Sequence, residues 1–313
     1  MTIDRSFHHC YGLVLDSELP LLDLGPDLGP AAAQTPGAEI VTIRRGALDG
    51  RPASADPLPL GLWREGDRLG LDVPGTASYL VRGGREIVVD AEADADPRTV
   101  RLFLLGTVMG GLMMQRGHLV LHGNAFRVGD ACAVVVGRSG AGKSTLAAEL
   151  QRRGLDVLAD DVVPVDRDGN ALPGYPRIKL WEDAVTRLGV DPAGLERVAQ
   201  AVDKFQLPIE RTWTEPLPLR WVYVLERHEG DDLTITRAGG METFGLLHEH
   251  TYRNELVHGD AVVREHLDLC GRVAARSRIS RVTRPARLMT AEATADAILS
   301  DIAGPAGTVQ ESA

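Results

Sequence analysis

Short apolar runs, separated by clusters of Gly, Pro and Asp, make up the first third of the chain. The runs are rich in Val, Leu and Ile, which is typical of β-strands, and Pro74-Gly75 and Gly83-Gly84 are typical of hairpin turns. We therefore predict a small β-rich N-terminal domain over residues 1–95. Its residues leave open whether it recognises a substrate, forms a dimer or serves as scaffold. The predicted strands are Tyr11–Leu15, Glu39–Ile43, Arg68–Val73, Ser78–Val81 and Glu86–Val89.

An almost wholly apolar segment follows this domain. Asp96 and Pro97 suit the N-cap and the first turn of a helix that runs to Gln115. Because the helix is apolar nearly all round, we expect it to be buried. The apolar run 100–114 contains Arg101 and is too short to span a bilayer. The segment leads into a predicted strand, His118–Leu121.

The centre of the chain shows a strand, a glycine-rich turn and a helix in succession. Ala131–Val136 is a valine-rich run typical of a buried strand. Thr145–Arg153 has one apolar face and is followed by Gly154, which suits the end of a helix. Between them, Gly137–Ser144 matches G-x-x-x-x-G-K-[ST], the phosphate-binding loop. Motif and context together predict a site for the phosphates of a nucleotide.

Each residue type in this loop suits a phosphate group. The glycines let the backbone turn and expose N–H groups, which bind phosphate oxygens together with the positive end of the following helix. Lys143 is expected to bind the β- and γ-phosphates, and the Ser144 hydroxyl to ligate Mg²⁺. ATP and Mg²⁺ are the predicted cofactors. The predicted nucleotide-binding residues are Gly137, Arg138, Ser139, Gly140, Ala141, Gly142, Lys143, Ser144 and Thr145.

Two adjacent carboxylates follow the next apolar run. Val157–Ala159 is expected to be a buried strand that ends at Asp160 and Asp161. Neighbouring side chains of a strand point to opposite faces, so one carboxylate can face a metal and the other a substrate. Ligands of open α/β sheets bind at this end of the strands. We interpret the pair as a metal ligand and a general base.

The order of these segments resembles the catalytic domain of HPr kinase/phosphorylase, the bacterial enzyme that phosphorylates a serine of a small phosphocarrier protein. The resemblance rests on Leu121-His122-Gly123, the phosphate loop, Arg153-Gly154 and Ala159-Asp160-Asp161. It covers residues 118–165, and the chain has Thr145 where that family usually has Glu.

The resemblance implies a role for each of these residues. Lys143 and the loop would hold ATP, and Ser144 would hold the metal. Asp161 would take the proton from the attacking serine, with Asp160 beside the metal. His122 would stand near the transferred phosphoryl group. A second metal-binding carboxylate follows in this family, and Glu182 is the candidate for it here.

The resemblance also implies the architecture and the reaction. We expect an α/β fold, with a P-loop HPr-kinase-like (carboxykinase-like) domain over residues 96–304 and a disordered tail at 305–313. Related kinases are associated with modification of small ribosomally made peptides, including lasso peptides. The expected activity is ATP-dependent phosphorylation of a serine hydroxyl on a small protein or peptide. A carboxykinase-like kinase of small molecules and a non-catalytic ATP-binding regulator remain as alternatives.

Composition narrows the partners and the compartment. The chain of 313 residues carries a net charge of −10, which argues against a broad nucleic-acid footprint and against binding to an anionic membrane. Its three cysteines are far apart, as expected of free thiols in a reducing cytoplasm, and no basic-plus-apolar signal opens the sequence. We expect a cytoplasmic protein. The family resemblance implies that it can form homo-oligomers.

The remaining segments offer fewer candidates. Arg177 and Lys179 are cations close to the nucleotide site, so they suit either phosphates and an acidic substrate or a solvated loop. Arg284-Pro285-Ala286-Arg287 resembles a P-G-R segment late in the HPr kinase/phosphorylase family, which implies that Arg284 or Arg287 stabilises transition-state charge. Lys204–Pro208 is expected to be loop. Four histidines lack the ligand spacing of a metal site, namely His248, His250, His258 and His266. Helix 260–276 is expected to turn inward Val263, Leu267, Cys270 and Val273.

Overall fold

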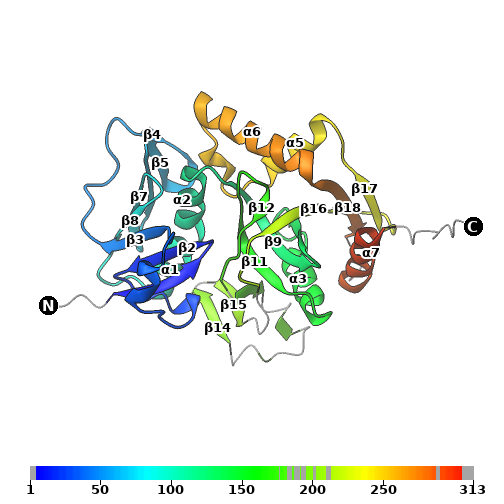
Figure 1. The fold of residues 1–313 in the computed structure, drawn as a ribbon, viewed down its shortest axis with the longest axis horizontal. Coiled ribbons are helices and arrows are strands. Elements are labelled where there is room, and N and C mark those ends of the chain that lie inside the picture. Colours follow the sequence, from blue (N-terminus) through cyan, green and yellow to red (C-terminus); the bar gives the residue numbers. More distant parts are fainter. Residues whose placement is uncertain are drawn as a thin grey trace, which may run out of the picture.

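The computed structural model describes residues 5–175, 177–181, 185–186, 191, 195–199, 202–208, 213–286 and 290–304. Glu182, Arg287 and the tail 305–313, about which the sequence makes predictions, lie outside these residues. The described residues form an eight-stranded, a seven-stranded and a three-stranded sheet. Figure 1 shows the eight-stranded sheet at one end of the molecule and the seven-stranded sheet filling the other.

The N-terminal sheet confirms all five predicted strands and both predicted hairpin turns. Its order is β1-β2-β3-β8-β7-β6-β5-β4, with β2, β3 and β8 parallel and the other pairs antiparallel. The sequence gives no expectation for three of these strands, β1, β4 and β5. The bounds are β1 Ser6–Cys10, β2 Leu13–Ser17, β3 Ile40–Arg45, β4 Asp56–Pro57, β5 Leu62–Glu65, β6 Arg68–Val73, β7 Ala77–Arg82 and β8 Glu86–Ala91, with short 3₁₀ turns at Leu22–Leu24, Pro30–Gln34 and Pro59–Gly61.

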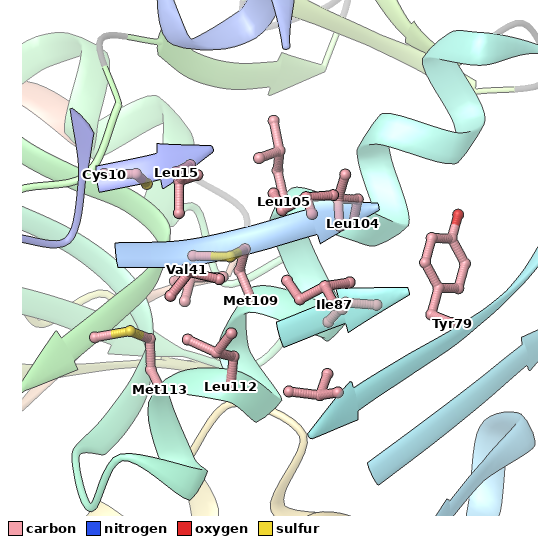
Figure 2. Close-up of a cluster of buried hydrophobic side chains, with 14 of the residues drawn as sticks. Cys10, Leu15, Val41, Tyr79, Ile87, Leu104, Leu105, Met109, Leu112 and Met113 are labelled. Carbon is pink, nitrogen blue, oxygen red and sulfur yellow. The ribbon is translucent and has the colours of Figure 1, made fainter. Parts of the chain in front are cut away.

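The predicted buried helix is present and packs on this sheet. It consists of α1 (Pro97–Phe103), a π-helical segment (Leu104–Val108) and α2 (Met109–Gln115). Asp96 caps it as expected, because its carboxylate accepts a hydrogen bond from the Arg98 N–H at 3.2 Å. Figure 2 shows side chains of the π-helical segment and α2 interleaved with Leu15, Val41 and Ile87 of the sheet. The helix thus shares one apolar core with the N-terminal sheet, while the predicted domain division at residue 95 stays a prediction.

The seven-stranded sheet lies between two pairs of helices. Its order is β10-β9-β11-β12-β16-β18-β17, and β16 also pairs in parallel with β10, so the sheet curls towards itself. Apolar residues of α5 and α6 cover one face and those of α3 and α7 cover the other (Figure 1). The bounds are β9 Leu119–Val128, β10 Ala131–Gly137, α3 Lys143–Arg152, β11 Val157–Val165, β12 Asn170–Ala171, β16 Leu217–His228, β17 Thr234–Arg237, α5 Met241–Glu249, a 3₁₀ turn Asn254–Leu256, α6 Asp260–Arg276, β18 Arg278–Pro285 and α7 Ala291–Ala303.

Three expectations about the elements of the chain need correction. Strand β11 does not end at the twin aspartates but runs on to Val165, because it continues to pair with β9. Lys204–Pro208 is not a loop but belongs to β15 (Val202–Pro208). Helix α6 turns Cys270 and Val273 inward as expected, but not Val263 and Leu267, because His266 packs against His248 and faces the core in their place. The buried stripe is His266, Leu269, Cys270 and Val273, whereas Val263 and Leu267 are exposed.

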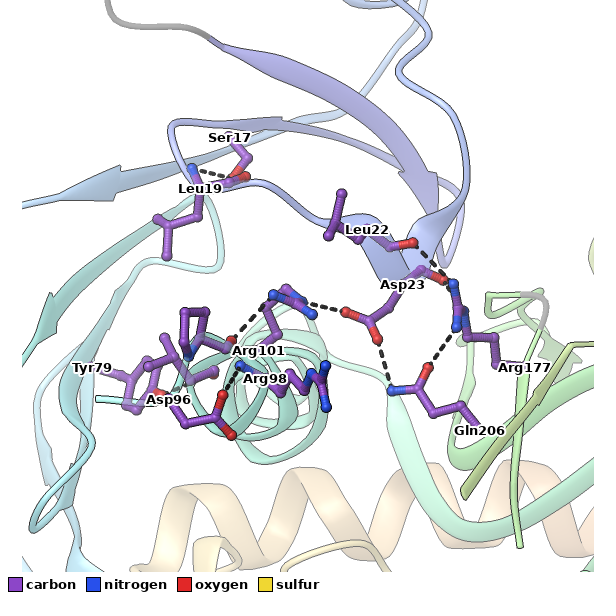
Figure 3. Close-up of polar contacts among 12 residues, drawn as sticks. Ser17, Leu19, Leu22, Asp23, Tyr79, Asp96, Arg98, Arg101, Arg177 and Gln206 are labelled. Carbon is purple, nitrogen blue, oxygen red and sulfur yellow. Dashed lines mark hydrogen bonds and ion pairs between the residues drawn. The ribbon is translucent and has the colours of Figure 1, made fainter. Parts of the chain in front are cut away.

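A small third sheet connects the two large ones. It consists of β13 (Arg177–Trp181), β15 and β14 (Glu196–Ala199), in the order β13-β15-β14. Figure 3 shows how it is attached: buried Asp23 accepts hydrogen bonds from Arg101 of α1 at 2.6 Å and from Gln206 of β15 at 2.8 Å. Arg177 of β13 donates to the main-chain oxygens of Leu22 and Asp23, both at 3.1 Å. The N-terminal segment therefore holds both α1 and the third sheet.

All three cysteines are buried and unpaired, as expected. Within the described residues, no helix is long and apolar enough to cross a membrane.

Candidate functional site

The glycine-rich turn leaves β10 and enters α3 in a conformation that L-residues avoid. Gly142, the N-cap of α3, has φ +97°, and no side chain caps the helix start. The first-turn N–H groups of α3 therefore point at the site without a side-chain acceptor, as an anion-binding helix start requires. A Cβ on Gly142 would lie 2.3 Å from Arg284 Nη2, and one on Gly137 would lie 2.8 Å from the Leu225 carbonyl oxygen. Both positions require glycine.

The lysine of the motif lies over its own loop. Lys143 Nζ donates to the carbonyl oxygen of Gly137 at 2.6 Å and contacts that of Arg138 at 3.4 Å. Ser144 and Thr145, next in the chain, are half-buried at the start of α3. Ser139 and Gly140 are exposed, so the top of the loop is open to a ligand.

A buried arginine supports the loop from beneath. Arg284 of β18 donates from Nε at 3.2 Å, and also from Nη2, to the carbonyl oxygen of Ala141. Its Nη1 reaches Thr290 Oγ1 at 3.2 Å. Burial, aided by the nearby Arg227, lowers the pKa of Arg284. These contacts tie the guanidinium to the loop main chain, which suits support of the loop better than the role at the transferred group expected from the sequence.

The second carboxylate of the pair lies in an unusual backbone conformation beside two positive or ionisable groups. Asp161 has φ +70°, the left-handed region, which Asp tolerates better than most residues. Its Oδ2 accepts from Lys179 Nζ at 3.0 Å, and its Oδ1 lies 3.2 Å from His122 Nδ1. Burial alone would raise the pKa of Asp161, but the Lys179 ammonium and His122 hold it well below its usual value. The Asp161 carboxylate therefore stays ionised.

The first carboxylate of the pair points into the protein. Asp160 is buried, accepts a hydrogen bond from the Asn124 amide, and accepts another from the Lys179 main-chain N–H at 2.8 Å. Both aspartates thus contact the same residue of β13, one through its main chain and one through its side chain. The left-handed backbone of Asp161 interrupts the simple alternation of faces expected for a strand.

Three tyrosines surround the Lys179–Asp161 ion pair. Tyr11, Tyr175 and Tyr252 are buried, and burial raises the pKa of each hydroxyl. Tyr11 comes from the turn between β1 and β2, and its N–H donates to the Pro173 carbonyl oxygen at 2.8 Å. The N-terminal sheet therefore contributes directly to the surroundings of Asp161. Lys179 is itself buried, which alone would lower its pKa, but Asp161, together with Tyr175, Tyr252 and Asp160, raises that pKa well above its usual value.

The strand register brings the loop and Asp161 to the same level of the sheet. Val136, the residue before the loop, pairs with Gly123 of β9, and Gly123 pairs on its other side with Asp161. Two strand spacings, or about 10 Å, separate the two positions in this direction. A cavity of about 510 Å³ joins them. This aspartate cavity is lined by Gly137 and Arg138, by His122 and Asp161, by Leu102, Phe103 and Thr107, and by residues 249–255.

A second cavity of about 540 Å³ lies on the other side of the loop, and we call it the arginine cavity. It is lined by Arg138–Ala141, Leu225–Arg227, Glu249–His250 and Arg281. Arg227 is exposed, and no ion pair to it occurs among the described residues. Arg227 is not among the site residues predicted from the sequence. It lies at the carboxyl end of β16, the apolar strand that runs parallel to β10, and the carboxyl ends of such strands are where ligands bind.

His250 lies between the two cavities and lines both. Burial lowers the pKa of His250 to about 4, and the nearby cations of Lys143 and Arg138 act in the same direction. The pKa of His266 is also lowered to about 4 by burial. Within the part of the chain that is described, no three His, Cys, Asp or Glu side chains gather to hold a metal ion.

The residues present fit a nucleotide and its metal in part. The loop main chain, Lys143 and the uncapped start of α3 suit a triphosphate, and the Ser144 hydroxyl is placed at that helix start. Asp160 is engaged by Asn124 and Lys179, so its role as a metal ligand stays a prediction. Glu182, the other predicted ligand, lies outside the described residues.

Comparison with known proteins gives a distant similarity. No protein-family model and no curated protein matches the chain. Among solved structures, the Hpr(Ser) kinase/phosphatase from Coxiella burnetii is similar to it, with 11% identity, 59% of this chain and 90% of that protein covered, and a TM-score of 0.27. A similarity of this size carries no conclusion, so the function proposed below rests on the site itself.

Proposed function

We propose that this chain is an ATP- and Mg²⁺-dependent kinase that phosphorylates a hydroxyl group, that of a serine in a small protein or ribosomally made peptide. The observation that carries the proposal is the aspartate cavity, which joins the first residues of the phosphate loop to the half-buried, ionised carboxylate of Asp161. Positioning of a phosphoryl donor and an acceptor hydroxyl is what phosphoryl transfer chiefly requires.

The loop side of the aspartate cavity, formed by the phosphate loop and the start of α3, would bind the phosphoryl donor, ATP. The N–H groups at the start of α3 and the Lys143 ammonium would bind the phosphate oxygens, for which Lys143 would exchange its present contact with the Gly137 carbonyl oxygen. Bound Mg²⁺, held by Ser144 and phosphate oxygens, would supply neutralisation of charge on the β- and γ-phosphates. Arg284 holds the loop in this shape from beneath.

The acid side of the cavity, formed around Asp161, would bind the acceptor hydroxyl. Asp161 would accept a hydrogen bond from the attacking hydroxyl and orient its oxygen towards the γ-phosphorus. The new P–O bond forms at this oxygen, the bond from the γ-phosphorus to the ADP oxygen breaks, and the hydroxyl proton passes to Asp161. A carboxylate with a low pKa is a weak base, but a loose phosphoryl-transfer transition state needs little base strength. Asp160 would serve by holding β9 and β13 beside Asp161.

A small hydroxyl compound is the second candidate acceptor. A volume of about 510 Å³ is within the usual range of small-molecule sites as well as being suited to a short peptide segment. The carboxykinase-like alternative therefore differs from the first proposal in its acceptor and not in its donor site.

The test is incubation of the protein with labelled ATP, Mg²⁺ and serine-bearing peptides, followed by mass spectrometry. We expect a gain of about 80 Da, the phosphoryl group, on a peptide serine. A protein that binds ATP and phosphorylates a small hydroxyl compound but no peptide would support the carboxykinase-like alternative. One that binds ATP and transfers phosphoryl to neither class of acceptor would be a regulator, and the kinase proposal would be wrong.

A further inference from the structure

The aspartate cavity has an apolar wall that its chemistry with phosphate does not explain. Leu102 and Phe103, at the end of α1, line it together with the loop and Asp161. Both side chains are half-buried, whereas Leu104 and Leu105, which follow them, are almost wholly buried in the N-terminal core. Apolar side chains that face a cavity beside a few placed polar groups are typical of a ligand-binding wall.

The helix that carries this wall is held firmly. Arg101, the residue before Leu102, is buried and pairs with Asp23, and Asp96 caps the start of α1 (Figure 3). Immediately after Phe103 the helix widens into the π-helical segment Leu104–Val108, a rare form found mainly at functional sites. In that segment, Thr107 accepts a hydrogen bond from Arg253 Nε at 3.1 Å across the cavity wall.

Charge does not distinguish acceptors at this wall. The acids Glu249 and Glu255 line the cavity, and so do Arg138 and Arg253, so cations and anions balance beside Asp161. Selection among acceptors then falls to the apolar pair. Because consecutive Cα atoms of a peptide are about 3.8 Å apart, a serine placed at Asp161 puts its neighbour's side chain in the same cavity.

We propose that Leu102 and Phe103 form an apolar subsite for the side chain next to the acceptor serine, so that the enzyme selects peptides in which an apolar or aromatic residue flanks that serine. The N-terminal sheet, which holds α1, thereby takes part in acceptor recognition. The inference rests on the proposed kinase function and adds the class of peptide that the site takes.

The test compares peptides that differ only in the residue beside a single serine. Leu- or Phe-flanked peptides are expected to exceed Asn-, Asp- and Lys-flanked peptides in kcat/KM by about tenfold or more, the usual value of an apolar side chain in a fitted pocket. Leu102→Ser and Phe103→Ser should each reduce this preference and leave ATP affinity unchanged. Phe103→Leu should retain most of it. Leu28→Ser, which alters an exposed leucine of the N-terminal sheet region, is the matched control and should leave it intact.

Each outcome bears on the inference. Equal transfer to all peptides by the wild type overturns the subsite while the kinase function stands, and this result needs no variant to fold. A preference that survives both Ser variants, with ATP affinity intact, also overturns it. No transfer to any peptide, despite ATP binding, overturns the proposed peptide kinase and the subsite with it.

Discussion

The two sides of the aspartate cavity are built in opposite ways. The loop side consists of β10, the glycine turn and α3, which are one continuous segment of chain. The acid side brings together Asp161 of β11, His122 of β9 and Lys179 of β13, with Tyr11 from the N-terminal sheet beside them. The first side depends on backbone shape, and the second depends on buried charges that meet only when the whole chain has folded.

This difference teaches where the site is vulnerable. Main-chain N–H groups of the loop are fixed locally and need only a glycine conformation and the support of Arg284. The Asp161 carboxylate stays ionised because Lys179 lies beside it. Lys179 belongs to β13, which Arg177 anchors to the N-terminal segment. Changes far from the cavity should therefore affect the acid side and leave the loop side unchanged.

The largest effect is expected from Lys179→Met, which removes the cation of the buried pair. We expect a loss of about 3 kcal/mol in the free energy of unfolding, the low end for breaking a buried pair, because part of Asp161 is exposed. Urea denaturation at neutral pH measures it. Lys179→Met combined with Asp161→Asn should recover much of the stability but no transfer activity. If the single variant is as stable as the wild type, the acid side does not depend on this pair.

The same variant should change the pH dependence. The pKa of Asp161 is lowered in the folded protein, so the pair contributes fully above the ordinary carboxyl pKa of about 4 and its contribution is lost as pH falls below it. Without Lys179, one of the two groups that lower the pKa of Asp161 is lost and only His122 opposes burial, so this pKa rises from its wild-type position. The acidic limb of the pH–rate profile of transfer should then move to higher pH, whereas Lys179→Arg should keep it near the wild-type position.

Gly142→Ala tests the loop side alone. Its Cβ would meet Arg284 at 2.3 Å, and the left-handed backbone at φ +97° costs an L-residue about 1 kcal/mol or more. We expect ATP affinity, measured by calorimetry, to fall by about tenfold. Gly154→Ala is the matched control, since Gly154 has φ +86° but open space around its Cβ position. Equal ATP affinity in Gly142→Ala and the wild type would show that loop shape does not govern ATP binding.

Asp23→Asn should give the smallest effect and act at a distance. It weakens the hydrogen bonds that hold α1 and β15, so we expect a several-fold rise in KM for the acceptor with unchanged ATP affinity. Asp72→Asn is the control, because Asp72 is hydrogen-bonded to Trp63 and Ser78 within the N-terminal sheet only. A change in ATP affinity rather than in acceptor KM would contradict the division between the two sides.

The same division explains what could be predicted from the sequence. The loop, its strand and its helix can be predicted because their sequence signals are local. These signals are three glycines, a lysine and an apolar run on either side. Helix 260–276 has the predicted bounds, yet only half of its predicted inward face is buried, because the contact of His266 with His248 joins distant parts of the chain. Periodicity alone does not contain such a contact.

The acid side can be predicted only in part from the sequence, for the same reason. The position of Asp161 after an apolar run marks it as a candidate, but nothing in the local sequence pairs it with Lys179. From the sequence, Lys179 suits either a phosphate or acidic substrate or a solvated loop. The prolines at 173, 176 and 208 favour loops near them. The structure instead forms β13 from Arg177 onward and β15 up to Pro208, since β13, at its edge of the third sheet, is held by Asp160 and Arg177. The supporting role of Arg284 likewise depends on β18, a strand that is absent from the predictions made from the sequence.

The central claim is that Lys143 and Asp161 serve a single ATP-dependent transfer, and Asp161→Asn tests it most directly. The variant should bind ATP with wild-type affinity, because Asp161 is not part of the loop, and should transfer phosphoryl groups at least about 100-fold more slowly, the usual contribution of a positioned base. Transfer at the wild-type rate, with ATP bound, would contradict the claim.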